Sequence, residues 1–118
     1  MNQEEFINAI RVAVENSAVK SVETYLIKPP GRSPNIKLLA LSDWYNKLSK
    51  KDQNMVLQVV KESVNTSIFG FLCVLDGVKA IGNSGEKGRL SLYYEKGQDR
   101  TLLNDFNDEF LHDLFSSE

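Results

Sequence analysis

Apolar positions recur at helical spacing over the first quarter of the chain. From Glu4 onward they recur at steps of three and four residues, with Phe6 beside Ile7, followed by Ile10, Val14 and Ala18. This spacing predicts an amphipathic helix, which either continues or restarts at Ser17. The helix must end by Lys28, because the two prolines that follow cannot continue it. Residues 29–34 are predicted to form an extended, exposed connector.

A second helical pattern occupies the middle of the chain. Ser42 is predicted to cap a short helix from Asp43 to Leu48, and Ser49, with Asp52 three positions later, to cap a long central helix. One face of that helix stays apolar at Val56, Val60, Val64, Ile68, Phe71 and Leu75. Residues 68–75 are apolar all round, so we expect neighbours on every side. Asp76 and Gly77 are predicted to end the helix.

The hydrophobic period changes from helical to two after Gly77. Alternation over residues 78–82 and 89–94 predicts two strands, and a turn at 96–98 leads to a third strand at 99–103. Asn104 or Asn107 can cap a last helix, whose apolar stripe is Phe106, Phe110, Leu111, Leu114 and Phe115. The pattern therefore predicts one α+β domain over residues 1–118, with N-terminal helices, a long central helix, a three-stranded antiparallel meander and a C-terminal helix.

Length and composition are those of an ordinary packed domain. The chain has 118 residues, of which 42% are hydrophobic and 25% charged. Its first residues are acidic rather than the basic start of a secretory signal, and the apolar stretch 68–75 is too short to cross a bilayer. We therefore expect a cytoplasmic protein that does not enter the membrane. The single cysteine, Cys73, fits a reducing compartment and is predicted to be a buried core residue.

Negative charge is concentrated at the C-terminal end. Residues 99–118 carry six acidic residues against Arg100 alone, a net charge of −5. This end should repel nucleic acid and attract a basic partner. Four of the acids fall in the predicted last helix, where the apolar stripe directs them outward: Asp105, Asp108, Glu109 and Asp113.

No catalytic, metal-binding or nucleotide-binding motif stands out, and no cofactor is predicted. His112, the only histidine, follows Asp108 by one helical turn, so the two could form a general base pair or, with Asp105, bind a metal. We favour the simpler interpretation, a partly exposed histidine among solvated acids. Tyr93 and Tyr94 point to opposite faces of their predicted strand, so one of them, Tyr93, is a candidate exposed anchor for a partner.

Three segments, residues 67–78, 88–95 and 110–115, resemble small uncharacterised bacterial single-domain proteins. Some small bacterial α+β proteins of this kind are immunity proteins, which neutralise a toxin. The resemblance covers roughly the second half of the chain, from about Trp44. It implies a bacterial, cytoplasmic protein and brings no catalytic residues with it.

Three hypotheses about function follow from these observations. The leading one is a non-enzymatic protein-binding domain, of immunity or regulatory type, that binds a basic protein through Asp105, Asp108, Glu109, His112, Asp113 and Tyr93. The alternative is a small enzyme or ligand-binding domain that uses His112 with Asp108 and Asp76. A third is homodimerisation through an uncovered edge of the sheet.

Overall fold

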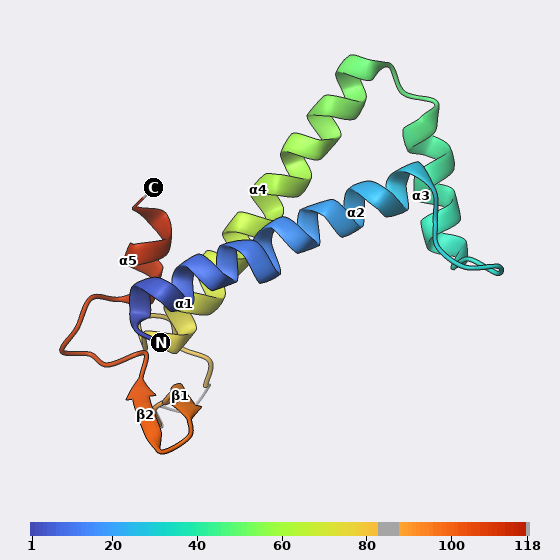
Figure 1. Ribbon diagram of the computed structural model, residues 1–118. Helices are drawn as coiled ribbons and strands as arrows, with labels where there is room; N and C mark the ends of the chain where they lie inside the picture. The colour runs from blue at the N-terminus through green and yellow to red at the C-terminus, as the bar shows by residue number, and fades with distance from the viewer. Residues whose placement is uncertain (83–87, 118) are drawn as a thin grey trace. The chain divides into compact units, whose positions relative to one another are not determined.

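The computed structural model describes residues 1–82 and 88–117 (Figure 1). The chain divides into two compact units. The terminal unit combines Met1–Val12 with Thr66–Glu118, and the central unit is Ala13–Asn65. Helices dominate both, and one small antiparallel sheet lies in the terminal unit. The predicted α+β class is therefore confirmed. The single domain stays a prediction, since two compact units are compatible with one domain or two.

The N-terminal helical segment begins one residue before the predicted start. It consists of α1 (Gln3–Ile10), a π-helical stretch η1 (Arg11–Asn16) and α2 (Ser17–Ile27). The Asn2 side chain accepts a hydrogen bond from the Glu5 amide at 2.8 Å, and the Glu5 carboxylate accepts one from the Asn2 amide at 3.0 Å. This reciprocal capping box satisfies amides that the first turn leaves without partners. Lys28 is extended, so the predicted end before the two prolines is confirmed.

Helix α3 (Ile36–Asn46) is longer than the short helix predicted from Ser42. Its cap is Asn35, whose side-chain oxygen accepts a hydrogen bond from the Lys37 amide at 2.8 Å. Ser42 lies inside the helix, where it is buried and donates its hydroxyl to the carbonyl of Ile27 at 3.3 Å. The prediction failed because an earlier cap was available directly after Pro34.

The long central helix is α4 (Lys50–Leu75), and its start is as predicted. Ser49 accepts a hydrogen bond from the Asp52 amide at 3.1 Å. The expectation of neighbours on every side of residues 68–75 is wrong, because Phe71 is 62% exposed while Leu72 is buried. Over the described residues, no helix combines the length and the apolar character that crossing a lipid bilayer requires.

The predicted three-stranded meander is wrong, since the described residues contain two strands. β1 (Tyr93–Lys96) pairs antiparallel with β2 (Asp99–Leu102), Tyr93 opposite Leu102 and Lys96 opposite Asp99. Residues 78–82 are not a strand, and residues 83–87, which make up most of the segment between the first two predicted strands, lie outside the described residues.

Backbone donors at the end of α4 explain why no strand starts at Val78. The amides of Val78 and Lys79 both donate to the carbonyl of Cys73, at 3.0 and 3.3 Å. Gly77 between them and the helix has φ of +75°, the left-handed conformation that closes a helix end. The first donors after the helix therefore complete its C-terminus instead of a sheet.

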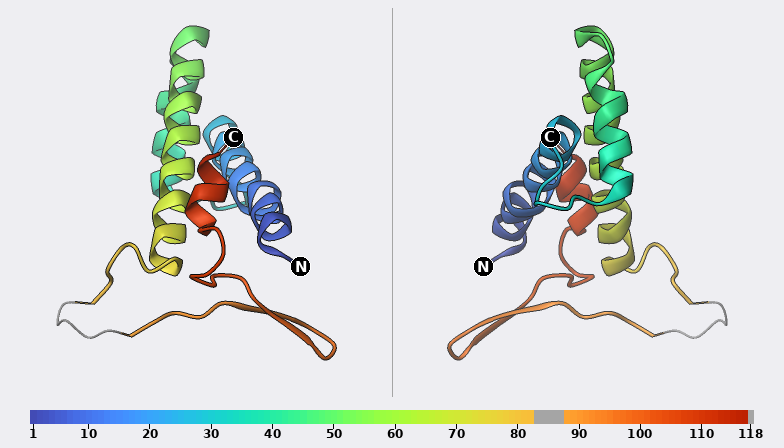
Figure 2. Two further views of the ribbon diagram at one scale, coloured as in Figure 1. Left: turned by 90° about the vertical axis from the view of Figure 1, so that its left-hand side faces the viewer. Right: turned by 90° about the vertical axis from the view of Figure 1, so that its right-hand side faces the viewer.

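The hydrophobic core lies in the terminal unit. Its buried members come from α1, α4 and the last helix, α5 (Leu111–Ser116): Ile7, Leu72, Leu111 and Phe115. Figure 2 shows α5 beside α1 and the end of α4 in both views. Both ends of α5 therefore lie close to residues far away in the sequence.

Candidate functional site

The buried carboxylate of Asp76 lies at the start of α5. Its side chain is 1% exposed, and its two oxygens accept hydrogen bonds from the backbone amides of Leu111 and His112, at 3.0 and 2.8 Å. These are amides that the first turn of a helix leaves without an internal partner. Asp76 thus caps a helix that begins 35 residues later.

The imidazole of His112 completes this arrangement. Its Nδ1 lies 2.7 Å from Oδ2 of Asp76, and its Nε2 lies 3.4 Å from Oδ1 of Asp113. Phe110 stacks on the ring and Phe69 meets it edge-on, with ring centroids 5.5 and 5.6 Å away. The side chain is 15% exposed, so His112 is partly exposed as predicted, but its closest carboxylate is the buried one of Asp76 rather than a solvated acid.

The hydrogen-bonded carboxylate partner of His112 is Asp76 rather than Asp108, the residue that the less favoured interpretation paired with it. The pairing required both residues on one helix, whereas α5 begins at Leu111 and leaves Asp108 in the preceding turns. The spacing of one helical turn has no meaning outside a helix. Asp76, at the end of α4, takes that place instead.

The C-terminal end of α5 is held by a side chain from η1. Nη2 of Arg11 donates to the carbonyls of Leu114 and Phe115, at 3.2 and 2.6 Å. The guanidinium also lies 5.2 Å from the centroid of the Phe115 ring. A cation at a helix C-terminus satisfies carbonyls left without partners and favours the helix dipole. α5 therefore has an anion at one end and a cation at the other, both from distant parts of the chain.

Asn104 is a buried hydrogen-bonding centre rather than the predicted helix cap. Its side-chain nitrogen donates to the carbonyls of Leu75 and Leu90, at 2.6 and 2.7 Å, and its oxygen accepts from the amide of Leu92 at 2.8 Å. The residue is 1% exposed. It joins the end of α4 to the chain before β1 and to the chain after β2.

The four predicted acidic residues do not share one helix. Asp105, Asp108 and Glu109 belong to the turns before α5, here called the acidic loop (residues 105–109), and only Asp113 lies in the helix. Asp105 shapes the loop, since its carboxylate accepts from the Asn107 amide at 3.0 Å. Asp108 and Glu109 are exposed, and within residues 1–82 and 88–117 no lysine or arginine forms an ion pair with either.

Two exposed aromatic rings of the terminal unit each make a cation–π contact with an arginine side chain. The Arg100 guanidinium lies 3.8 Å from the centroid of the Tyr93 ring, and that of Arg89 lies 3.9 Å from the centroid of Phe106. Tyr93 is partly exposed as predicted, but its outer face is shared with Arg100. Phe106, predicted to face the core, is half-exposed inside the acidic loop. The structure thus places an apolar ring among the acids.

Cys73 is partly buried rather than a core residue. Burial, and then the nearby carboxylate of Asp76, raise the pKa of its thiol, while Lys79 opposes the shift. A raised pKa disfavours the thiolate, which is the nucleophilic form. The thiol is therefore poorly suited to catalysis.

Alkylation of Cys73 by iodoacetamide should be several-fold slower in the native chain than in urea at the same mildly alkaline pH. The folded state prefers the protonated thiol, so the pKa of Cys73 is higher in the folded chain than in the unfolded chain. The protonated thiol therefore contributes its full stabilisation below the pKa of the unfolded chain, and this contribution is lost as the pH rises through the pKa of the folded chain. The alkylation rate of the native chain should accordingly keep rising with pH where the alkylation rate of the unfolded chain has already levelled off. Coincident pH profiles of the two rates would contradict the shift.

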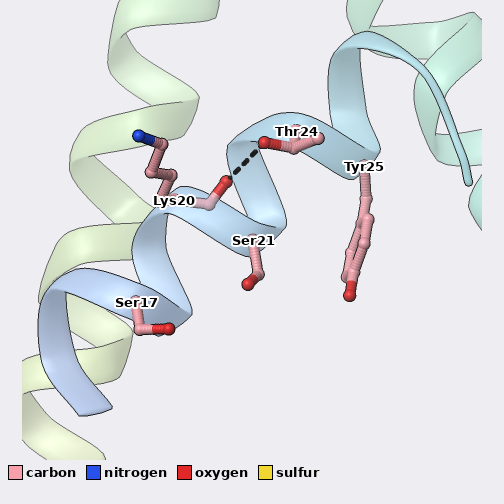
Figure 3. Close-up of a pocket in the computed structure, with 5 residues that line it drawn as sticks. All are labelled: Ser17, Lys20, Ser21, Thr24 and Tyr25. Atoms are coloured by element: carbon pink, nitrogen blue, oxygen red, sulfur yellow. Dashed lines mark hydrogen bonds between the residues drawn. The ribbon is translucent and has the colours of Figure 1, made fainter. Parts of the chain in front are cut away.

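In the described part of the chain, neither a metal-ligand cluster nor the hollow along α2 adds a further site. Among the described residues, no group of three or more histidine, cysteine or acidic side chains could hold a metal ion. A hollow of about 210 Å³ lies along α2, where it is lined by Ser17, Lys20, Ser21, Thr24 and Tyr25 (Figure 3). One helix supplies its whole lining, so the hollow surrounds no ligand on several sides, as a binding pocket does.

Sequence reasoning missed the functions of Asn104 and Arg11 and gave Asp76 too small a part. Asp76 alone carried a signal, as an acid directly after a long apolar helix, where an uncompensated carboxylate would otherwise be buried at a cost.

No protein-family model, curated protein or solved structure matches this chain. The resemblance to small bacterial proteins therefore stays a prediction, and the function rests on the site itself.

Proposed function

We propose that this chain is a non-enzymatic protein-binding domain of bacterial immunity or regulatory type, which binds a basic partner protein through the acidic loop. The observation that carries the proposal is the pair of exposed carboxylates of Asp108 and Glu109, which have no lysine or arginine partner among the described residues. Residues 99–118 as a whole carry a charge of −5. In the bacterial cytoplasm, a basic protein surface would complement them.

An apolar contact beside the charges supports the same proposal. Phe106 is half-exposed between Asp105 and Asn107, and Arg89 covers part of its ring. Gly77 packs below it, since a Cβ built on Gly77 would lie 2.9 Å from the ring. An aromatic side chain held in place on its inner side and open on its outer side is typical of an interface anchor.

Reversing the two free carboxylates, with Asp108→Lys and Glu109→Lys together, should slow association with a basic partner by about tenfold or more at low salt. The two wild-type charges attract the partner over a distance that salt screens, so the rates of wild type and variant should converge at high salt. Asp105 is left unchanged because its carboxylate holds the loop turn. The measurement is surface plasmon resonance with a partner recovered from host lysate by the tagged wild-type chain.

The control for this variant is Glu62→Lys, which changes one exposed carboxylate on α4 in the central unit. Compared with Asp108→Lys alone, it alters the net charge equally but leaves the acidic loop intact. We expect the control to associate nearly as fast as wild type. Equal slowing by both single variants would assign the effect to net charge and remove the acidic loop as the binding surface.

The alternative is an enzyme or ligand-binding domain, and one observation favours it, the 2.7 Å contact between His112 and Asp76. The same carboxylate accepts hydrogen bonds from two backbone amides of α5, and aromatic rings flank the imidazole. These contacts hold the start of α5 in place whether or not a ligand binds. A ligand whose binding is lost in His112→Phe, which keeps an aromatic ring at this position, would favour the alternative.

A further inference from the structure

Helix α3 of the central unit is apolar on its outer as well as its inner side. Tyr45 packs inward and is buried, whereas Ile36 is 82% exposed and Trp44 51% exposed, with Leu39 and Leu41 also exposed. α3 packs against α2, and its residues Ser42 and Asn46 donate hydrogen bonds to the carbonyl of Ile27 at the end of α2. A helix that is apolar all round normally has neighbours on several sides, and an exposed apolar patch of this kind marks an interaction surface.

Basic residues flank this helix along the chain. Residues 28–51 contain six lysine and arginine residues against the single acid Asp43, a net charge of +5, and all six are exposed: Lys28, Arg32, Lys37, Lys47, Lys50 and Lys51. Lys47 pairs with Asp43 at 3.0 Å. Within the part of the chain that the structure describes, no acid forms an ion pair with any of the other five. The face therefore fits an acidic surface with an apolar centre.

The acidic loop is such a surface. It carries the exposed carboxylates of Asp108 and Glu109 around the half-exposed ring of Phe106, in a segment whose charge of −5 balances the +5 of residues 28–51. We propose that the outer face of α3 docks on the acidic loop of a second copy of this chain. The inference rests on the proposed function, because it names a partner for the same acidic surface.

Self-association follows from the presence of both surfaces on every copy. In a pair related by a twofold axis the contact forms twice, which closes the assembly. Trp44 and Phe106 are the aromatic anchors, and the surrounding charges set the partner and the orientation. The dimer should be salt-sensitive, since its charged groups are exposed.

The test is a charge swap measured by sedimentation equilibrium of the purified chain. The basic-face variant carries Arg32→Glu and Lys37→Glu, and the acidic-loop variant carries Asp108→Lys and Glu109→Lys. All four positions are exposed, and an acid at Lys37 suits the start of α3, so both variants should keep the wild-type circular dichroism. We expect twice the monomer mass for wild type at low salt and the monomer mass for each variant alone.

An equimolar mixture of the two variants should regain the dimer mass, because each reversed surface then meets one of opposite charge. A monomeric wild type, a dimeric variant or a mixture that stays monomeric would overturn the proposal. The experiment contains no other protein, so its failure concerns the second copy alone. Failure of the proposed function would appear separately, as unchanged association of the acidic-loop variant with a basic partner from the host.

Discussion

Replacing Asn104 with alanine should lower the free energy of unfolding by about 2–4 kcal/mol, since three partly buried backbone groups lose their hydrogen-bond partner and each fully buried loss of this kind costs about 1–3 kcal/mol. The three groups are the carbonyls of Leu75 and Leu90 and the amide of Leu92. Urea unfolding followed by circular dichroism measures the loss. Amide hydrogen exchange at Leu92 should show where the structure opens.

Asn54→Ala is the matched control for this prediction. Asn54 is exposed in the first half of α4, so the same chemical change there removes no buried partner. The free energy of unfolding of this control should stay within about 0.5 kcal/mol of the wild-type value, as for most surface substitutions. A loss below about 1 kcal/mol for Asn104→Ala would mean that water or a shifted backbone replaces the amide, and the buried centre would then be unimportant for stability.

Asp76→Ala should cost about 2–4 kcal/mol, which combines the loss of a helix cap with buried donors left without an acceptor. Leu111 is fully buried, so water cannot easily replace the carboxylate at its amide. His112 loses its 2.7 Å partner as well. We expect exchange at the amides of Leu111 and His112 to become faster than in wild type, together with an earlier urea transition.

Asp76→Asn separates the two contributions to this effect. Asparagine keeps one oxygen that can cap α5, but its amide nitrogen is a donor and cannot accept from the second amide or from a protonated Nδ1 of His112. Its stability should therefore lie between wild type and Asp76→Ala. If the asparagine variant matched wild type while alanine did not, one oxygen at the start of α5 would account for the stabilisation, and the negative charge of Asp76 would contribute nothing.

Elements whose ends depend on neighbouring residues were predictable from the sequence. The prolines after Lys28, the Ser49 cap of α4 and the left-handed Gly77 act through backbone geometry and hydrogen bonds within a few residues. The start of α3 was predicted wrongly, although its cap is equally local: Asn35, directly after Pro34, accepts from the Lys37 amide. Ser42 is a suitable cap by residue type, but it lies inside the helix and donates to the end of α2.

The sequence by itself determined the helix-rich α+β class, the long central helix and the concentration of acid near the C-terminus, since each follows from periodicity, capping or composition. Only the tertiary structure decided that Asp76 caps α5, that Asn104 is buried and that the acidic loop is not helical. The contacts of Asp76 and Asn104 join residues about 12 to 36 positions apart. The partner of a side chain at such a distance depends on which backbone groups the packed core leaves without a hydrogen bond. No local pattern of residues predicts which groups these are.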